Sequence, residues 1–236
     1  MQDYRRLRFA EGYASTDPAF ARALPFRDTT GRNVAIWRLR ARHYMVMRAG
    51  LALLTNVHRV LDVGAGNGWL ARRLAARYRV TALDVDATDT GLAALDDSRV
   101  GRIRGELEAL PVRDGTFDVV IVAAALHYAV HLSRALSEIA RVLRAGGVLI
   151  ISDSPFYSDA LARHRAWQRT LAYYQAAGVA HLAGRYQGLT RAELDGPGLF
   201  RFVTLSPGYE PLRAALGRWR GREAGPRMPV VFGWKR

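Results

Sequence analysis

The sequence has no cysteine among its 236 residues, which excludes a disulfide framework, a thiolate metal site and a cysteine nucleophile. Long apolar runs are also missing, since the longest one, residues 119–126, is far shorter than a membrane helix. The first residues, MQDYRRLRF, are basic but no apolar stretch follows them, so we expect no secretory signal. From these absences we expect a cytoplasmic protein with no membrane span and no metal site.

Lysine is scarce too: Lys235 is the only one, so nearly all of the net charge of +14 comes from arginine. A charge this large favours a nucleic acid or another anionic surface as the partner. The arginines are spread along the chain rather than clustered, however, and this favours a bias of composition instead. We therefore expect a small-molecule substrate, and nucleic acid is the less favoured alternative. The sequence leaves the oligomeric state open.

The most informative stretch present is RVLDVGAGNGWLARRLAA, residues 59–76. Its first half contains a short apolar run, which predicts a strand buried on both faces of a parallel sheet. A glycine-rich turn and an apolar pattern of helical spacing follow. Because glycine lacks a β-carbon, such a turn brings backbone amides close to a ligand at the carboxyl ends of the strands. We assign Gly64, Ala65 and Gly66 to cofactor binding.

The spacing of the turn distinguishes between cofactors. A dinucleotide fingerprint reads G-x-G-x-x-G, whereas here the glycines read G-A-G-N-G and Trp69 stands where close packing needs a small residue. No G-K-[ST] follows, which argues against a phosphate loop. Asp62, just before the turn, can pair with a cationic ligand group and would repel a phosphate. The pattern D-x-G-x-G-x-G resembles motif I of the class I S-adenosylmethionine-dependent methyltransferases.

A second acidic residue supports a nucleoside ligand. Residues 79–86, RVTALDVD, predict another buried strand, and Asp84 lies 20 residues beyond Gly64. That spacing matches the acid that accepts hydrogen bonds from ribose hydroxyls in nucleotide-binding βαβ units. A carboxylate suits the task because it offers two acceptor oxygens to a diol. We assign Asp84 to the ribose and Val85 to the adenine face, and expect Asp86 or Thr88 to cap a following helix.

The third strand, predicted over residues 100–104, ends at a turn before Glu106 and Leu107. The methyltransferase resemblance implies that an acid and an apolar neighbour here contact the adenine. Glu106 replaces the commoner aspartate of that family, which lengthens the reach of the side chain. Glu108 is a competing acid that we expect to face solvent.

Two further strings strengthen the resemblance. LPVRDGTFDVVIVAAALHY, residues 110–128, is similar to a stretch of the methyltransferase group that includes ubiquinone and menaquinone biosynthesis enzymes. The resemblance implies that the backbone after its strand, at Ala123, borders the methionine end of the cofactor. RVLRAGGVLIISD, residues 141–153, resembles the family's glycine-glycine strand. We expect its glycines to end an amphipathic helix over residues 131–143 and a strand to begin at Val148.

The flanks carry fewer signals. Residues 1–33 have aromatic residues but no clear period, so they form either a lid over the site or a packed extension. Residues 33–55 predict a helix with one face that packs on the sheet, formed by Trp37, Ala41, Tyr44, Met45 and Arg48. A further helix is predicted over residues 158–177, an irregular segment over 179–198, and last strands over 202–205 and 230–234, with a short helix over 212–219 between them.

The expected fold is α/β and Rossmann-like: a seven-stranded, mostly parallel sheet with helices on both faces and an N-terminal helical extension. We treat residues 1–236 as one domain in four parts. They are an N-terminal lid and helix (1–55), a cofactor-binding core (56–155), a substrate-covering insertion (156–200) and the last two strands (201–236). Since the resemblance covers residues 60–151, it says little about the flanks and does not by itself give the function.

The resemblance implies methyl transfer by in-line displacement from S-adenosyl-L-methionine, with S-adenosyl-L-homocysteine as the product. A base is needed only if the acceptor loses a proton, and His127 is our candidate because of its place after the fourth strand and its ordinary pKa. The alternative is a rim histidine bonded to a backbone carbonyl. Asp153 and Tyr128 are weaker candidates, and we expect His43 to serve helix packing.

Aromatic residues in several segments favour a small acceptor, aromatic or lipid-like: Tyr13, Trp37, Tyr44, Tyr128, Phe156, Tyr157 and Trp167. The competing interpretation is that at least half of these rings belong to the core. Two other functions stay open at this point. One is a methyltransferase that acts on RNA or protein, and the other is a cofactor-binding protein without transfer activity.

Overall fold

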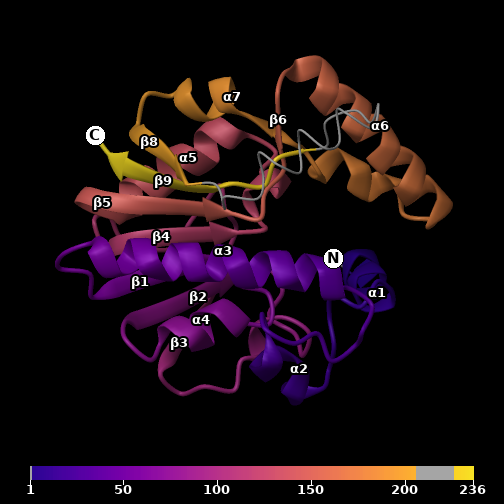
Figure 1. Cartoon of the computed structure of the whole chain (residues 1–236), viewed down its shortest axis with the longest axis horizontal. Coiled ribbons are helices and arrows are strands. Elements are labelled where there is room, and N and C mark those ends of the chain that lie inside the picture. The colour runs from indigo at the N-terminus through magenta and orange to yellow at the C-terminus, as the bar shows by residue number, and fades with distance from the viewer. Residues whose placement is uncertain (1, 206–225) are drawn as a thin grey trace.

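The computed structural model describes residues 2–205 and 226–236. It contains a seven-stranded sheet in the order β3-β2-β1-β4-β5-β9-β8, and a separate pair, β6-β7 (Figure 1). The strands are β1 (Arg59–Val63), β2 (Arg79–Asp84), β3 (Val100–Arg104), β4 (Phe117–Ala123), β5 (Leu143–Ser152), β6 (Phe156–Tyr157), β7 (Leu189–Thr190), β8 (Phe200–Leu205) and β9 (Val230–Lys235).

Helices alternate with most of these strands, as the sequence pattern indicates. They are α1 (Gln2–Ala10), α2 (Pro18–Ala23), α3 (Val34–Leu53), α4 (Trp69–Leu74), α5 (Leu132–Val142), α6 (Ala160–Ala176) and α7 (Arg191–Asp195), with 3₁₀ helices η1 (Leu92–Ala94), η2 (Leu126–Tyr128) and η3 (Ala180–Arg185). Within the described residues, no helix is long and apolar enough to cross a membrane.

Sheet register confirms the predicted topology. β1 pairs in parallel with β2 and with β4, and β4 pairs in parallel with β5. β9 runs antiparallel to both of its neighbours, β5 and β8. The strands β1 to β5 therefore finish at the same edge, and an open sheet of this kind binds ligands beyond its carboxyl ends.

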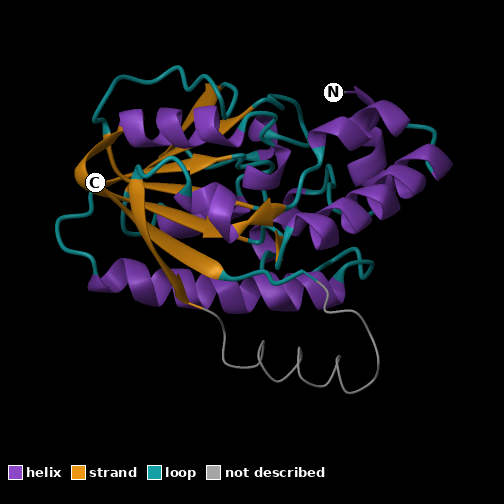
Figure 2. Cartoon of the chain, turned by 90° about the horizontal axis from the view of Figure 1, so that it is seen from above, coloured by secondary structure: helices purple, strands orange, loops and turns teal. Residues whose placement is uncertain are grey.

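Each face of the sheet is covered by its own apolar layer. Leu70 and Leu74 of α4 and Tyr44, Met47 and Leu51 of α3 pack on one face. The side chains of α5 and α7 pack on the other face. Figure 2 shows α3 along one side of the sheet. Because both faces are buried, the central strands are almost wholly apolar, and this explains why they can be predicted from short hydrophobic runs.

Several predicted details are corrected by the structure. Met45 does not belong to the packed face of α3, since its side chain is 47% exposed. The glycines after Arg144 do not end a helix: α5 stops at Val142, and Gly146 and Gly147 lie inside β5. There the pairing with β4 shifts register between Phe117 and Val119, which places the extra residues in an irregularity of the strand.

Two loops also differ from the prediction. The segment after β2 forms only the 3₁₀ helix η1, because Asp86 accepts bonds from Thr88 and so stabilises a turn rather than capping an α-helix. Residues 179–198 are less irregular than expected, with η3, β7 and α7 inside them. The predicted helix over residues 212–219 lies outside the described residues. The division of the chain into four parts stays a prediction.

The N-terminal helices and α6 gather at the carboxyl end of the sheet (Figure 1). Leu7 of α1 packs with Tyr174 of α6 and with Leu182 of η3. Phe20 and Leu24 pack on Trp37 at the start of α3. The N-terminal segment is thus a packed element, and it lies where it can cover a site at the strand ends.

Candidate functional site

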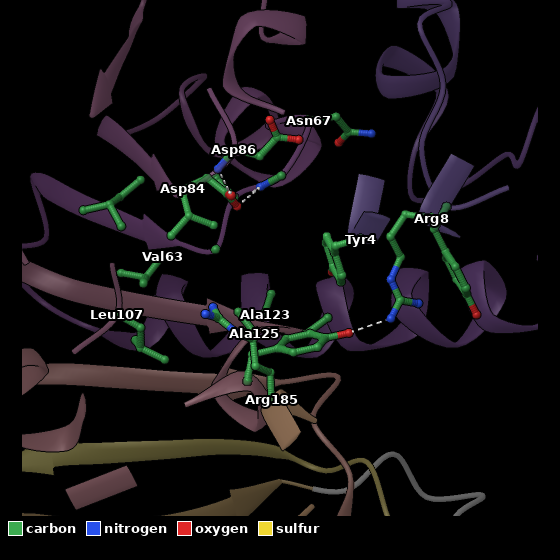
Figure 3. Close-up of a pocket in the computed structure, with 18 of the residues that line it drawn as sticks. Tyr4, Arg8, Val63, Asn67, Asp84, Asp86, Leu107, Ala123, Ala125 and Arg185 are labelled. Atoms are coloured by element: carbon green, nitrogen blue, oxygen red, sulfur yellow. Dashed lines mark hydrogen bonds between the residues drawn. The ribbon is translucent and has the colours of Figure 1, made fainter. Parts of the chain in front are cut away.

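A cavity of about 700 Å³ opens at the carboxyl ends of the parallel strands. One end, which we call the acidic end, is lined by Asp84, Asp86, Glu106 and Glu108. The other, the aromatic end, is lined by Tyr4, Tyr13, Trp37, Tyr128 and Tyr174. Figure 3 shows Asp84 and Asp86 on one side of the cavity and Tyr4 and Arg8 on the other. Cavities of this size hold small molecules of cofactor dimensions.

The glycine turn, residues 64–66, forms part of the cavity wall. Gly64 and Gly66 have φ of +73° and +53°, a region that L side chains rarely adopt. The amides of Gly64 and Ala65 both donate to the carbonyl of Leu83, at 2.8 and 3.1 Å, which ties the turn to β2. A β-carbon on Gly64 would lie 2.3 Å from Cβ of Ala125, whereas one on Gly66 would meet nothing within 4 Å. Backbone at Gly66 is therefore open to a ligand.

Asp84 lies at the end of β2 with its carboxylate on the cavity. Its Oδ2 accepts a bond from the amide of Gly66 and its Oδ1 one from the amide of Asp86, both at 2.8 Å (Figure 3). Burial raises the pKa of this carboxyl. The two backbone bonds fix the orientation of the side chain and leave a lone pair on each oxygen. Such a carboxylate can accept two hydrogen bonds from a vicinal diol.

Asp62 lies behind the turn and is not among the residues that line the cavity. The side chain is 1% exposed, and its Oδ2 has no hydrogen-bond partner among the described residues. Burial, together with the charge of Asp84, raises the pKa of this carboxyl to about 7. The orphaned oxygen is a buried acceptor directly behind a turn that exposes its backbone to the cavity.

The remaining predicted cofactor residues do line the cavity. Val85, Glu106 and Leu107 line its acidic end, and Ala123 lies beside the glycine turn. Glu108 was expected to face solvent, but it lines the cavity as well, and its Oε1 accepts bonds from the amides of Val130 and His131, at 2.6 and 3.0 Å. This carboxylate thus orders the segment after η2.

His127 lies behind the cavity wall instead of in it. The ring is 5% exposed, is absent from the cavity lining, and its Nδ1 lies 3.2 Å from Oγ of Ser154. Its neighbour Tyr128 does line the cavity, and the two rings lie 4.4 Å apart. Burial, with the charges of Arg40 and Arg8, lowers the pKa of His127 to about 3. A ring of that pKa is neutral but weakly basic.

A second histidine, His43, forms a closer contact with a cavity residue than His127 does. Its Nδ1 lies 2.7 Å from Oδ1 of Asp153, and the ring is wholly buried. Asp153 lines the cavity and has φ of +56°, and its Oδ2 accepts a bond from Ser152 Oγ at 3.2 Å. Although burial opposes it, the bond from His43 and the charge of Arg40 lower the pKa of Asp153. Asp153 is therefore a carboxylate, and His43 does more than pack.

Helix α1 closes the mouth of the cavity through two arginines. Arg8 donates to the hydroxyls of Tyr128 and Tyr174, at 2.8 and 3.2 Å, and to Glu11 at 2.8 Å. Arg5 donates to Asp89 and Thr90 at 2.8 and 3.1 Å, beside the acidic end. Sequence reasoning missed both residues because their partners lie far away along the chain. The recurrent aromatic and arginine residues of α1 were the signal available.

Of the seven aromatic residues proposed for one pocket, Tyr13, Trp37 and Tyr128 line the cavity. The other four do not: Tyr44, Phe156, Tyr157 and Trp167. Tyr44 is part of the core beside α4. Tyr4 and Tyr174, which were not proposed, complete the aromatic end, and Tyr4 meets Tyr128 edge to face at 5.8 Å.

Comparison with known proteins agrees with this geometry. Residues 61–151 match the family model described as "Methyltransferase domain". The chain contains a class I methyltransferase domain. It is 34% identical over 170 residues to the malonyl-[acyl-carrier protein] O-methyltransferase of Methylococcus capsulatus, covering 67% of this chain and 59% of the relative.

A second curated relative and a solved structure agree with this result. The domain is 36% identical over 159 residues to the ubiquinone/menaquinone biosynthesis C-methyltransferase of Methylobacterium nodulans, covering 56% of this chain and 63% of that protein. The solved YcgJ protein of Bacillus subtilis superposes with a TM-score of 0.62 at 17% identity, over 83% of this chain and 99% of its own. The chain spans less than two thirds of the length of the curated relatives it matches, and the structural likeness shows the fold.

In this methyltransferase domain the residues assigned from sequence to cofactor binding gather around one end of the cavity. Val85, Glu106 and Leu107 come from the ends of β2 and β3, and the glycine turn follows β1. Among the described residues, no cluster of His, Asp and Glu has the arrangement of a metal site.

Proposed function

We propose that this protein transfers a methyl group from S-adenosyl-L-methionine to a small-molecule acceptor with an aromatic or lipid-like body. One observation carries the proposal: the fixed carboxylate of Asp84 and the open backbone of Gly66 share a cavity that continues into the aromatic end. The cavity therefore has room for two ligands that meet beside Ala123.

The residues fit the cofactor. Asp84 would accept hydrogen bonds from the ribose hydroxyls, and Glu106 with Leu107 and Val85 would hold the adenine. Gly64, Ala65 and Gly66 would border the methionine part through their backbone, and the orphaned oxygen of Asp62 would favour a cationic group nearby. Trp69 lines the cavity where a dinucleotide fold needs close packing, and this argues against NAD.

When bound, the cofactor supplies a methyl group on a sulfonium, with a neutral thioether as its leaving group. The protein has to align the acceptor with that methyl group and to exclude water. Helix α1 performs the second task in this proposal, because Arg5 and Arg8 fasten it across both ends of the cavity. Residues 156–200 would cover the acceptor from the opposite side through Tyr174, Leu182 and Arg185.

An acceptor that loses a proton needs a base. His127 stays the hypothesis from the sequence, but its position behind Tyr128 and its pKa of about 3 do not favour it. Asp153 lines the cavity as a carboxylate and is supported by His43, so it is the better-placed group. Tyr128 is not favoured as the base, because burial raises the pKa of its hydroxyl and the hydroxyl therefore keeps its proton.

The enclosure of the aromatic end favours a small acceptor. The aromatic end is surrounded by α1, α3, α6 and η3, whose residues all contribute to one cavity. The relatives' names mention malonyl-[acyl-carrier protein] and ubiquinone/menaquinone biosynthesis, and both are consistent with acceptors of a small-molecule or lipid type. The cytoplasmic location stays a prediction of the sequence.

Two other functions compete with this one. A methyltransferase acting on RNA or protein would need an open path from the cavity to a basic surface, and α1 covers the mouth instead. A cofactor-binding protein without transfer would have its aromatic end filled by side chains, whereas this end belongs to the cavity. Both observations favour the small-molecule enzyme.

The test is calorimetric titration with S-adenosylmethionine and with NAD, on wild type, Asp84→Asn and Asp84→Ala. We expect micromolar binding of S-adenosylmethionine alone, weakened by at least 100-fold in both variants because each loses an acceptor for the ribose diol. Asp114→Asn, at an exposed carboxylate in the turn before β4, is the matched control and should bind as wild type does. Binding of NAD, or of neither ligand, would overturn the proposal.

A further inference from the structure

Arg40 is a cation of the aromatic end that pairs with no acid among the residues the structure describes. It lies on α3 and lines the cavity, and its guanidinium lies over the ring of Trp37 at 4.5 Å and near that of Tyr13 at 5.7 Å. Its Nε is buried without a hydrogen-bond partner among the described residues. Among these described residues, no carboxylate lies within ion-pair distance of the Arg40 guanidinium.

Two other arginines at the mouth, Arg5 and Arg8, are matched by acids. Arg5 pairs with Asp89 and Arg8 with Glu11, each at 2.8 Å. Asp153 is the acid whose pKa responds to Arg40: although burial opposes it, the bond from His43 and then the charge of Arg40 lower that pKa. Asp153 makes its own bonds to His43 and Ser152, however. The carboxylate is therefore occupied, and the donors of Arg40 are left for another acceptor.

Electrostatics point the same way. Arg8 contacts Tyr128, next to His127, and after burial the charges of Arg40 and Arg8 both contribute to the lowered pKa of the His127 ring. Arg185 also lines this end, and among the described residues it has no ion-pair partner either. The facing acids are Glu11, bound to Arg8, and Asp153, bound to His43. The aromatic end thus has an excess of positive charge.

A half-buried guanidinium without a counter-ion is costly, since burial removes water that would solvate its charge. Arginine keeps its charge under all ordinary conditions and presents a planar fork of donors that matches carboxylate and phosphate oxygens. Stacking on two rings holds the plane of Arg40 in one orientation while leaving its edge free. These are the properties of an anion-binding arginine.

We propose that Arg40 binds an anionic group of the methyl acceptor, a carboxylate or a phosphate, while the surrounding rings contact the apolar body of that acceptor. The substrate class is then a small organic acid or phosphate ester with an aromatic or unsaturated part. This inference rests on the proposed function, because it concerns the acceptor end of the same cavity.

The test uses two matched pairs of probes, cinnamate with cinnamamide and phenyl phosphate with phenol. Each is titrated by calorimetry into wild type, Arg40→Met and Arg40→Lys, with and without saturating S-adenosylhomocysteine. Arg38→Met is the control, because Arg38 lies on the same helix, is exposed and does not line the cavity. Thermal denaturation of each variant shows whether it is folded.

We expect at least one anion to bind wild type and Arg38→Met at least 10-fold more tightly than its neutral partner. In folded Arg40→Met the preference should fall to below about 2-fold, and Arg40→Lys should keep part of it because lysine preserves charge but not the fork. The pair that shows the preference identifies carboxylate or phosphate as the group.

Three results would overturn the inference: no preference for either anion, a preference that survives in Arg40→Met, or no binding of either anion at millimolar concentration. The S-adenosylhomocysteine titration keeps the two proposals apart. If that ligand fails to bind while the anion preference depends on Arg40, the proposed cofactor is wrong and the anion site stands. If it binds and the preference is absent, the methyltransferase function stands alone.

Discussion

The two ends of the cavity are built in different ways. The acidic end comes from consecutive strand ends, and its key contacts are between a side chain and nearby backbone, as in Asp84 with the amides of Gly66 and Asp86. The aromatic end joins segments that are remote along the chain: Arg8 bonds Tyr128 and Tyr174 across 120 and 166 residues. The first end is a property of a sheet edge, whereas the second exists only where helices meet over it.

The charge of the two ends differs as well. Asp84, Asp86, Glu106 and Glu108 give the acidic end its negative charge, which would suit a ligand that offers hydroxyls, an amine and a sulfonium. Arg8 and Arg40 make the aromatic end basic. A single cavity with opposite charges at its ends can orient two ligands in opposite senses. The difference teaches that strand ends of the sheet build one end of the cavity, whereas the flanking helices build the other.

The largest expected loss of stability concerns the glycine turn in the cavity wall. Gly64→Ala combines a positive φ with a β-carbon only 2.3 Å from Ala125, so we expect a loss of about 3 kcal/mol, or roughly 6–12 °C in Tm. Gly66→Ala has the strain without the overlap and should lose about 1 kcal/mol, or roughly 2–4 °C. Thermal denaturation measures both. Equal losses would show that the contact with Ala125 is not the constraint.

A pH-dependent effect of a few kcal/mol is expected at Asp62. Its folded pKa of about 7 lies above the ordinary value of 3.8, so its contribution to stability is present below about pH 4 and is lost as pH rises through about 7. Asp62→Asn should therefore match wild type near pH 3.5 and become progressively more stable than wild type as the pH rises, by up to about 4 kcal/mol at pH 8.

Asp118 should affect the pH dependence of stability in the opposite sense to Asp62. Its carboxylate accepts bonds from the amides of His58 and Arg59 and from Arg144, which together lower its pKa despite burial. Asp118→Asn should destabilise the protein at pH 8 and do so less at acidic pH. Urea denaturation at several pH values tests both variants, and a pH-independent difference for Asp62→Asn would contradict its assigned ionisation.

The contacts of Arg8 and of Arg5, which hold α1 over the cavity, should stabilise the protein to different extents. Arg8→Met leaves two tyrosine hydroxyls and Glu11 without their donor in a partly buried place, so we expect a loss of about 2 kcal/mol and faster amide exchange in α1. Arg5→Met removes an exposed pair with Asp89 and should lose about 0.5 kcal/mol. Hydrogen exchange of residues 2–10 measures both, and equal protection in the two variants would show that α1 is held by its apolar contacts.

The smallest effect is expected at His127. Because its ring lies behind the wall and has a pKa of about 3, His127→Gln should change turnover of an identified acceptor by less than about 5-fold. A loss of 100-fold or more at unchanged Tm would establish the ring as the base after all. Asp153→Asn is the companion variant, and a larger loss there with a changed pH profile would assign the role to Asp153.

Local sequence pattern determined much of the acidic end. The apolar runs of β1, β2 and β4 predict strands because both faces of a parallel sheet are buried, and parallel strands must finish at one edge. Asp84 follows from a strand end and its spacing to Gly64, whereas Glu106 and Leu107 were implied by the methyltransferase resemblance. All three line one cavity. The irregular start of β5 was not predictable, because a glycine pair after a helix usually ends it.

Only the tertiary structure decided the aromatic end. No spacing links Arg8 to Tyr128 and Tyr174, or His43 to Asp153, because these contacts depend on how α1, α3 and α6 pack over the sheet. The same packing placed Tyr128 in the cavity and His127 behind it, a difference of one residue that no sequence period resolves. The sequence pattern determines contacts between residues that are close along the chain. The packing of the helices on the sheet decides which remote side chains share a cavity.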